Sequence, residues 1–113
     1  MHELALAEGI IDIIDAEQKK HGFSKVTGIT LAVGEFSGIV PECIRDFFPI
    51  AAKGSAAENA DIEISVIAAE FRCPDCSYEG GIDRKQACCP ECGSTGIRMV
   101  RGREFYVENL IVD

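Results

Sequence analysis

Basic side chains are scarce in this sequence: it has 11 Lys and Arg residues against 19 Asp and Glu residues, a formal net charge of −8. Proteins that hold nucleic acids electrostatically need clustered Lys and Arg side chains. The composition therefore argues against nucleic-acid binding as the main activity. The segment from Glu70 to Arg103 departs from this balance, because it has six basic and five acidic side chains.

Long apolar runs are missing as well. No uninterrupted apolar stretch approaches the ~18 residues of a membrane-spanning helix, and Glu3 and Glu8 stand where a signal peptide would carry Lys or Arg. We therefore expect a cytoplasmic protein with no membrane partner. In that compartment the six cysteines are more often metal ligands or redox groups than disulfides, because thiols are kept reduced.

The usual signs of an enzyme are also lacking. The sequence shows no nucleophile paired with a base and an orienting group, and no phosphate-binding glycine loop. The stretch GEFSG, residues 34–38, lacks the Lys and Ser/Thr pair of a P-loop. We expect no catalytic activity and no hydrolysis of GTP by this chain.

Periodic apolar positions predict a first helix from Leu4 to about Lys20. Its apolar stripe comprises Leu4, Ala7, Ile10, Ile11 and Ile14. Gly22 suits the left-handed position that follows a helix. His21 is explained as a cation at the negative end of the helix dipole, so it is not needed as a metal ligand.

Strands are predicted at residues 26–34, 61–69 and 103–112, where apolar residues alternate with polar or small ones. Pro41 fits the first position of a second helix. The apolar stripe of that helix comprises Ile44, Phe47, Phe48 and Ala51. Pro49 should kink this helix before it ends near Gly54, because proline lacks the amide hydrogen and its ring collides with a carbonyl of the preceding turn.

Two C-x-x-C pairs give the strongest signal. Cys73-Pro-Asp-Cys76 and Cys89-Pro-Glu-Cys92 are separated by twelve residues. Each turn supplies two thiolates along one edge of a tetrahedron, and the connecting stretch can bring the second turn opposite the first. We predict a zinc site with Cys73, Cys76, Cys89 and Cys92 as ligands. A closed site of four thiolates has no open position for water, so it should not catalyse hydrolysis. Its role should be to fold this segment.

Other interpretations of the cysteines remain open. A thioredoxin-like redox motif would need one C-x-x-C pair at the start of a helix, whereas here there are two in turn-rich sequence. Iron can also bind four thiolates. Cys88 is either a spare thiol near the metal or an alternate ligand in place of Cys89, and Cys43 is most simply a small buried hydrophobe.

The α+β fold class follows from the order of these elements: two helices packed on a small mixed β-sheet, with an inserted zinc-ribbon-like lobe that holds the Cys₄ site. Residues 1–69 and 103–113 should form one domain, and residues 70–102 a second, zinc-binding domain.

The first three residues form a second candidate metal site. The α-amine of Met1, with the backbone nitrogen and the imidazole of His2, can close two adjacent chelate rings around one ion. Nitrogen donors in a plane favour Ni(II) or Cu(II) over Zn(II), and Glu3 can supply an oxygen or orient the imidazole. The alternative is a frayed helix start, in which Glu3 and Glu8 only complement the helix dipole.

Taken together, these features closely resemble the HypA/HybF family of hydrogenase nickel-incorporation proteins. The resemblance rests on the opening MHE, the amphipathic helix after it, the stretch VGEFSGIVPE and the spacing of the cysteines, and it covers essentially the whole chain. Some family members carry histidines beside the zinc cysteines, and this sequence has none there.

The resemblance implies a metallochaperone that receives Ni(II), works with the GTPase HypB and passes the ion to the large-subunit precursor of a [NiFe] hydrogenase. It implies a nickel site at Met1, His2 and Glu3, within a nickel-binding domain of residues 1–69 plus 103–113. It also implies structural Zn(II) on the four cysteines. A homodimer is an option that the sequence leaves open.

Two other functions compete with this one. A zinc-ribbon module that binds nucleic acid or protein could use Arg84, Lys85, Arg98, Arg101 and Arg103, although the acidic remainder of the chain argues against nucleic acid. A rubredoxin-like electron carrier would need iron in the four-thiolate site and would be red.

Overall fold

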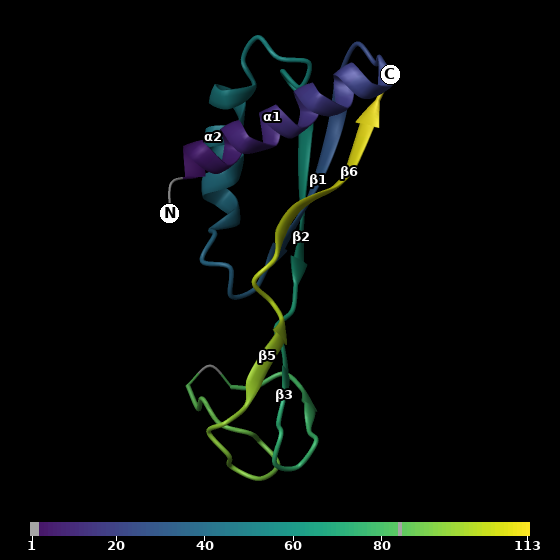
Figure 1. The fold of residues 1–113 in the computed structure, drawn as a ribbon. Coiled ribbons are helices and arrows are strands. Elements are labelled where there is room, and N and C mark those ends of the chain that lie inside the picture. The colour runs from purple at the N-terminus through teal and green to yellow at the C-terminus, as the bar shows by residue number, and fades with distance from the viewer. Residues whose placement is uncertain (1–2, 84) are drawn as a thin grey trace.

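Two three-stranded sheets, one beyond the other, carry the fold (Figure 1). The computed structural model describes residues 3–83 and 85–113. The first sheet contains β2 (Asp61–Ile67), β1 (Val26–Gly34) and β6 (Phe105–Val112) in that spatial order, and the second contains β4 (Glu79–Gly80), β3 (Glu70–Arg72) and β5 (Arg98–Arg101). The molecule is elongated, with extents of 54 × 25 × 17 Å. We call residues 70–102 the cysteine lobe and the remainder the helical lobe.

The first helix, α1 (Glu3–His21), forms where the apolar periodicity predicts it. Its buried residues are Ala7, Ile10, Ile11 and Ile14. Leu4 belongs to the predicted apolar stripe but is 39% exposed. The helix ends at His21. The next residue, Gly22, has a φ of +72°, and its N–H donates to the Gln18 carbonyl at 2.8 Å. No helix in the described part of the chain is long and apolar enough to cross a membrane.

The central strand of the first sheet is β1, which pairs in parallel with β2 and antiparallel with β6. Leu31 lies opposite Ile64 on one side and Val107 on the other. The predicted mixed sheet is therefore confirmed. Both helices lie on the same face of this sheet (Figure 1), and the side chains of Ile29, Leu31 and Val33 are buried in the core.

The second helix, α2 (Pro41–Ala52), begins at Pro41 as predicted and continues past Pro49. It ends at Ala52, before Gly54, whose φ is +81°. Its buried residues are Ile44, Phe48 and Ala52. Phe47, predicted in the apolar stripe, is 36% exposed. The buried face is thus narrower than the apolar face, because the sheet covers only one side of this helix.

Two predicted strands are longer than the observed ones. β2 stops at Ile67. The Ile67 carbonyl accepts the N–H of Glu35 at 2.8 Å, and the N–H of Ala69 donates to the Glu35 carboxylate at 2.7 Å. β6 begins at Phe105, after Gly102 turns the chain with a φ of +131°. The short strands β3, β4 and β5 within the cysteine lobe were not predicted.

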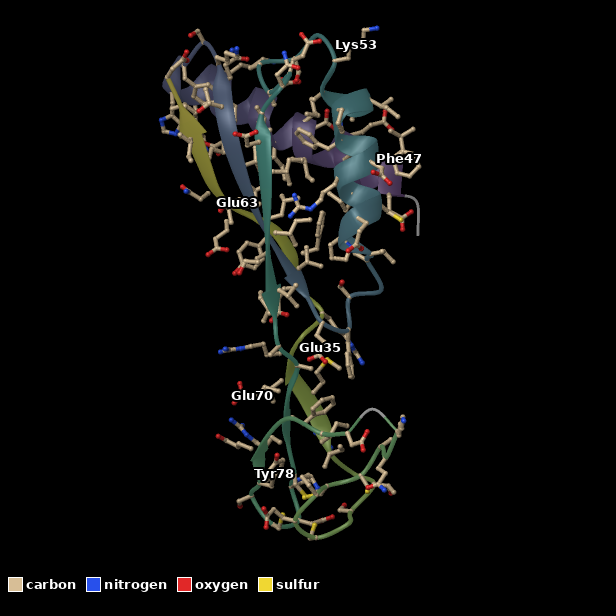
Figure 2. The ribbon with its side chains drawn as sticks, turned by 180° about the vertical axis from the view of Figure 1, so that it is seen from behind. Glu35, Phe47, Lys53, Glu63, Glu70 and Tyr78 are labelled. Carbon is tan, nitrogen blue, oxygen red and sulfur yellow. The ribbon has the colours of Figure 1, made fainter. Side chains whose placement is uncertain are left out.

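The lobes meet at a junction formed by residues 34–36, 67–69 and 102–104. The N–H of Gly34 donates to the Glu104 carbonyl and the N–H of Phe36 donates to the Gly102 carbonyl, each at 2.7 Å. The Phe36 ring packs edge-on against Phe71 of the cysteine lobe, with ring centroids 5.8 Å apart. Figure 2 shows Glu35 at this junction. The predicted turn GEFSG therefore also attaches one lobe to the other.

Candidate metal centre

The four predicted zinc ligands lie together in the cysteine lobe. The sulfur atoms of Cys73, Cys76, Cys89 and Cys92 are all within 4.8 Å of one another. The Cys73 and Cys92 sulfurs are 3.6 Å apart, and those of Cys76 and Cys89 are 3.5 Å apart. Cys73 and Cys89 are buried, whereas Cys76 and Cys92 are exposed. Each turn therefore contributes one inner and one outer thiol.

These distances suit a tetrahedral ion. Four sulfurs at about 2.3 Å from one zinc lie about 3.8 Å apart in a regular tetrahedron. The observed pair distances of 3.5 and 3.6 Å are close to this value. None of the four cysteines forms a disulfide. The donor set and its spacing therefore fit a structural zinc ion held by four thiolates, and they fit iron in the same geometry.

The two C-x-x-C turns have the same backbone hydrogen bonds. In the first, the N–H of Ser77 donates to the Cys73 carbonyl at 3.0 Å, and the N–H of Cys73 donates to the Tyr78 carbonyl at 2.9 Å. In the second, Gly93 takes the place of Ser77 and donates to the Cys89 carbonyl at 2.9 Å. The N–H of Cys89 donates to the Ser94 carbonyl at 2.8 Å. The repeated C-P-acid-C sequence thus produces a repeated structure.

The residue after each pair of cysteines is left-handed. Gly93 has a φ of +75°, and Ser77, in the matching position, has a φ of +65°. Glycine adopts this conformation freely, whereas serine does so at a cost. Ser77 was not predicted to adopt this conformation. Aligning C-P-D-C-S with C-P-E-C-G would have identified Ser77 as a residue held in this conformation by its turn.

One side-chain contact joins the two turns. The Ser94 hydroxyl donates to the Asp75 carboxylate, so a residue between the first two cysteines is tied to a residue that follows the last one. The backbone N–H of Glu91 also points at the Cys89 sulfur, 3.4 Å away. A hydrogen bond of this kind stabilises a thiolate, which is the form that binds a metal.

The thiol pKa values differ widely within the cluster. Burial raises the pKa of Cys89, but hydrogen bonds from the backbone N–H groups of Cys92 and Glu91 outweigh it and lower the pKa to about 7. For Cys76, the backbone N–H of Tyr78 lowers the pKa, whereas burial and hydrogen bonds with the other thiols raise it to about 12. The lowered pKa of Cys89 favours its thiolate, the form that binds a metal.

The other two cysteines lie outside the cluster. Among the described residues, the four-sulfur group does not include Cys88, so the structure gives no support to Cys88 as an alternate ligand. Cys88 is partly exposed. Cys43, on α2, is also partly exposed, so the expectation of a buried Cys43 was wrong.

Of the three residues predicted to bind nickel, Met1 and His2 lie outside the described residues. Glu3 is the first residue of α1 and is partly buried. The helix begins beside α2, in the helical lobe, and the cysteine cluster lies in the other lobe (Figure 1). Glu3 and the cysteine cluster therefore belong to different lobes of the molecule.

Comparison with known proteins decides the family. A family model described as "Hydrogenase/urease nickel incorporation, metallochaperone, hypA" matches residues 1–112. The chain belongs to the HypA family. The resemblance recognised in the sequence is thus confirmed over nearly its full length.

Several HypA-family proteins are similar over their whole length. Hydrogenase maturation factor HypA from Chlorobium luteolum is 40% identical over 100% of this chain and 97% of its own. HypA from Caldanaerobacter subterraneus is 33% identical over 100% of both chains, and maturation factor HybF from Klebsiella pneumoniae is 36% identical over 97% of both. These relatives bear the names of maturation factors and not of enzymes, which agrees with the expected lack of catalysis.

Solved structures support the fold. A solution structure of a HypA protein has a TM-score of 0.74 and 22% identity, and covers 99% of this chain and 96% of its own. The solution structure of the Ni metallochaperone HypA from Helicobacter pylori has a TM-score of 0.73 at the same identity, with 99% and 97% covered. The α+β class with an inserted cysteine lobe is therefore confirmed.

Proposed function

We propose that this HypA-family chain binds one Ni(II) through Met1, His2 and Glu3 and delivers it, in the cytoplasm, for maturation of a [NiFe] hydrogenase large subunit. The proposal rests mainly on the match of residues 1–112 to the HypA family model, together with the sequence MHE at positions 1–3. The metal ligands are the Met1 amine, the backbone nitrogen and imidazole of His2, and the Glu3 carboxylate.

The position of Glu3 supports such a site. Glu3 is the first residue of α1 and is partly buried. The carboxylate is attached to a helix whose inner face is buried in the core. A nickel site at the end of a chain can be dismantled by moving a few residues, as release to an acceptor requires.

The four cysteines hold Zn(II) in a structural role under this proposal. When bound, zinc joins the two C-x-x-C turns through four metal–sulfur bonds and leaves no position for water or substrate. Cys89 and Cys73 supply the buried ligands, and Cys76 and Cys92 supply the exposed ones. Binding requires thiolates, so it releases protons and weakens as the pH falls.

We assign the nickel-binding domain to residues 1–69 plus 103–113 and the zinc-binding domain to residues 70–102. This division is supported by the two sheets, since strands of one sheet do not pair with strands of the other. HypB, a GTPase, and the hydrogenase large-subunit precursor are the proposed partners. In this proposal the chain itself binds nickel, and HypB hydrolyses GTP.

A nickel titration followed by native mass spectrometry tests the nickel site. Untagged, zinc-loaded wild-type protein should take up one Ni(II) and keep its zinc, and His2→Ala should keep zinc but take up no nickel. His21→Ala is the matched control, because His21 lies at the other end of α1 with Glu17 3.2 Å away. Equal nickel uptake by wild type and His2→Ala would reject the site.

Delivery needs a separate measurement. Cells in which His2→Ala replaces the wild-type chain should contain unprocessed hydrogenase precursor and little hydrogenase activity. Cells with the His21→Ala variant should process the precursor and have normal hydrogenase activity. Full hydrogenase maturation with His2→Ala would contradict the delivery role, even if nickel binds in vitro.

A further inference from the structure

The outer face of the cysteine lobe carries an unusual pair of arginines. Arg72 on β3 lies directly opposite Arg98 on β5 in the antiparallel ladder. Directly opposite residues project from the same face of a sheet, with their Cβ atoms about 5 Å apart. Two like charges in such a pair repel each other and reduce stability. The pair therefore needs an explanation beyond the folding of this lobe.

The charges around the pair are only partly balanced. The Arg72 Nε is 2.9 Å from the Glu79 carboxylate, and Arg101 on β5 is 3.8 Å from Glu70. Within the described part of the chain, Arg98 has no ion pair. The Arg72 side chain is 61% exposed, so its contact with Glu79 contributes little and leaves other guanidinium N–H groups accessible. An anion at this position would satisfy both arginines.

The arginines stand over an apolar surface. Pro74 and Val100 line a shallow hollow of about 290 Å³ together with Arg72 and Arg98. Val100 is 51% exposed, and its position in β5 next to a register shift of the ladder still places it beside Arg98 on this hollow. The opposite face of this sheet carries Phe71, which is 7% exposed. This outer surface therefore combines two guanidinium groups with an apolar floor large enough for one or two side chains.

We propose that this surface, formed by Arg72, Pro74, Arg98 and Val100, docks an acidic segment of a partner protein, with a carboxylate between the two guanidinium groups and an apolar side chain on Pro74 and Val100. Guanidinium groups pair strongly with carboxylates through two parallel hydrogen bonds. The charge balance of the chain supports a local role: the segment from Glu70 to Arg103 is close to neutral, whereas the rest is strongly acidic. An acidic partner would be repelled by the rest of the chain and attracted to the two arginines of this surface.

The surface is less suited to nucleic acid. Proteins that bind single strands use aromatic side chains on which the bases stack, and none of the residues that line the hollow is aromatic. At about 290 Å³, the hollow lies at the lower limit of the ~300–1,000 Å³ of a typical small-molecule site. A protein segment with one carboxylate and a neighbouring apolar residue fits it best.

The test uses the full, zinc-loaded protein and a dye-labelled peptide of alternating glutamate and valine, with fluorescence anisotropy as the readout. The wild type should bind this peptide and not a peptide of alternating lysine and valine. Arg98→Gln and Arg72→Gln should each weaken binding by about tenfold, the loss of one charge-assisted hydrogen-bonded pair. Lys53→Gln is the control, since Lys53 is exposed at the end of α2 in the helical lobe (Figure 2) and loses the same charge.

Several results would overturn the proposal: no binding by the wild type, an equal loss of binding with Lys53→Gln, or displacement of the peptide by single-stranded RNA, which would make nucleic acid the ligand.

Thermal unfolding gives an independent check. Arg98→Gln should keep its zinc and unfold at the same or a higher temperature than the wild type, because the like-charge pair is removed. A lower temperature would show that Arg98 serves the fold. None of these measurements involves nickel.

Discussion

At the scale of single residues, the cysteine lobe depends on backbone conformation as much as on its thiols. Ser77 and Gly93 occupy matching positions in the two C-x-x-C turns and share a left-handed backbone, with φ values of +65° and +75°. Only one of the two turns has the residue that adopts this conformation without strain. The two turns are therefore built alike but are unequal in stability.

We predict that Ser77→Gly raises zinc affinity and that Gly93→Ala lowers it. A left-handed backbone costs a residue with a side chain about 1–2 kcal/mol, so each change should shift the zinc dissociation constant by roughly tenfold in opposite directions. Competition with a coloured zinc chelator measures both variants. Gly81→Ala is the control, because Gly81 has open space around it and no left-handed φ. Equal zinc affinities for Ser77→Gly, Gly93→Ala and wild type would show that the backbone conformation at these positions does not affect zinc binding.

A second residue-scale effect is set by pH. The Glu104 carboxylate accepts hydrogen bonds from the backbone N–H groups of Glu104 itself and of Gly102, and these lower its pKa. The Gly102 nitrogen lies 2.7 Å from the carboxylate. Because the folded-state pKa lies below the unfolded value of ~4.3, the ionised carboxylate stabilises the fold above that pH. This contribution is lost as the pH falls through the lower, folded value.

Glu104→Gln should therefore lower the unfolding temperature at pH 7, and the difference from wild type should shrink as the pH falls below about 4. Thermal unfolding at a series of pH values measures this. Glu108→Gln, an exposed position on β6, should show no such pH-dependent difference. A Glu104→Gln effect that stays constant down to acidic pH would mean that the charge of this carboxylate is not responsible.

At the scale of elements, the junction depends on close approach of two backbones. A Cβ placed on Gly34 would lie 2.3 Å from the Gly102 carbonyl oxygen and 2.7 Å from the Arg103 nitrogen. Those atoms belong to the segment that returns from the cysteine lobe to β6. Gly34 therefore permits the end of β1 and the start of β6 to lie against each other.

Gly34→Ala should destabilise the protein by about 1–3 kcal/mol, since backbone atoms must move to make room. Gly9→Ala, within α1, is the matched change: nothing lies within 4 Å of its Cβ position, and alanine favours a helix by up to about 1 kcal/mol over glycine. Urea unfolding should show these opposite effects. A stable Gly34→Ala variant would indicate that the junction is loosely packed.

The sequence predicted some elements better than others for physical reasons. α1 and β1 were placed within a residue because their patterns are long and their ends carry clear signals, such as Gly22. The exposure of Phe47, at 36%, could not be predicted, because periodicity shows an apolar face but not how much of it a neighbouring element covers. The four cysteines were grouped correctly because chelation fixes their spacing. The junction was missed, since the Glu35 contact with Ala69 joins residues distant in sequence.

At the scale of the whole molecule, the two lobes have separate sources of stability. The main apolar core contains buried residues from α1, β1, α2 and the loops next to α2, and none from the cysteine lobe. The cysteine lobe buries little apart from Phe71, Cys73 and Cys89. A lobe this small needs a metal or another cross-link to fold.

Removal of zinc should therefore unfold the cysteine lobe and leave the helical lobe folded. After treatment with a strong chelator, amide hydrogen exchange should become fast in residues 70–102 and remain slow in α1 and β1, and the helical circular dichroism signal should be retained. Reconstitution with zinc should restore protection. Loss of helical structure on zinc removal would show that the helical lobe depends on the metal through the junction.

The strand order also sets a sequence of events during synthesis. β1 pairs with β2 on one side and with β6 on the other, and β6 follows all four cysteines in the chain. The ribosome therefore delivers both C-x-x-C turns before the third strand of the first sheet is available. Because chains begin to fold while they are made, the cysteine lobe can capture its metal while β1 still has an open edge. Newly made chains therefore expose the β1 edge to other chains until β6 has been synthesised.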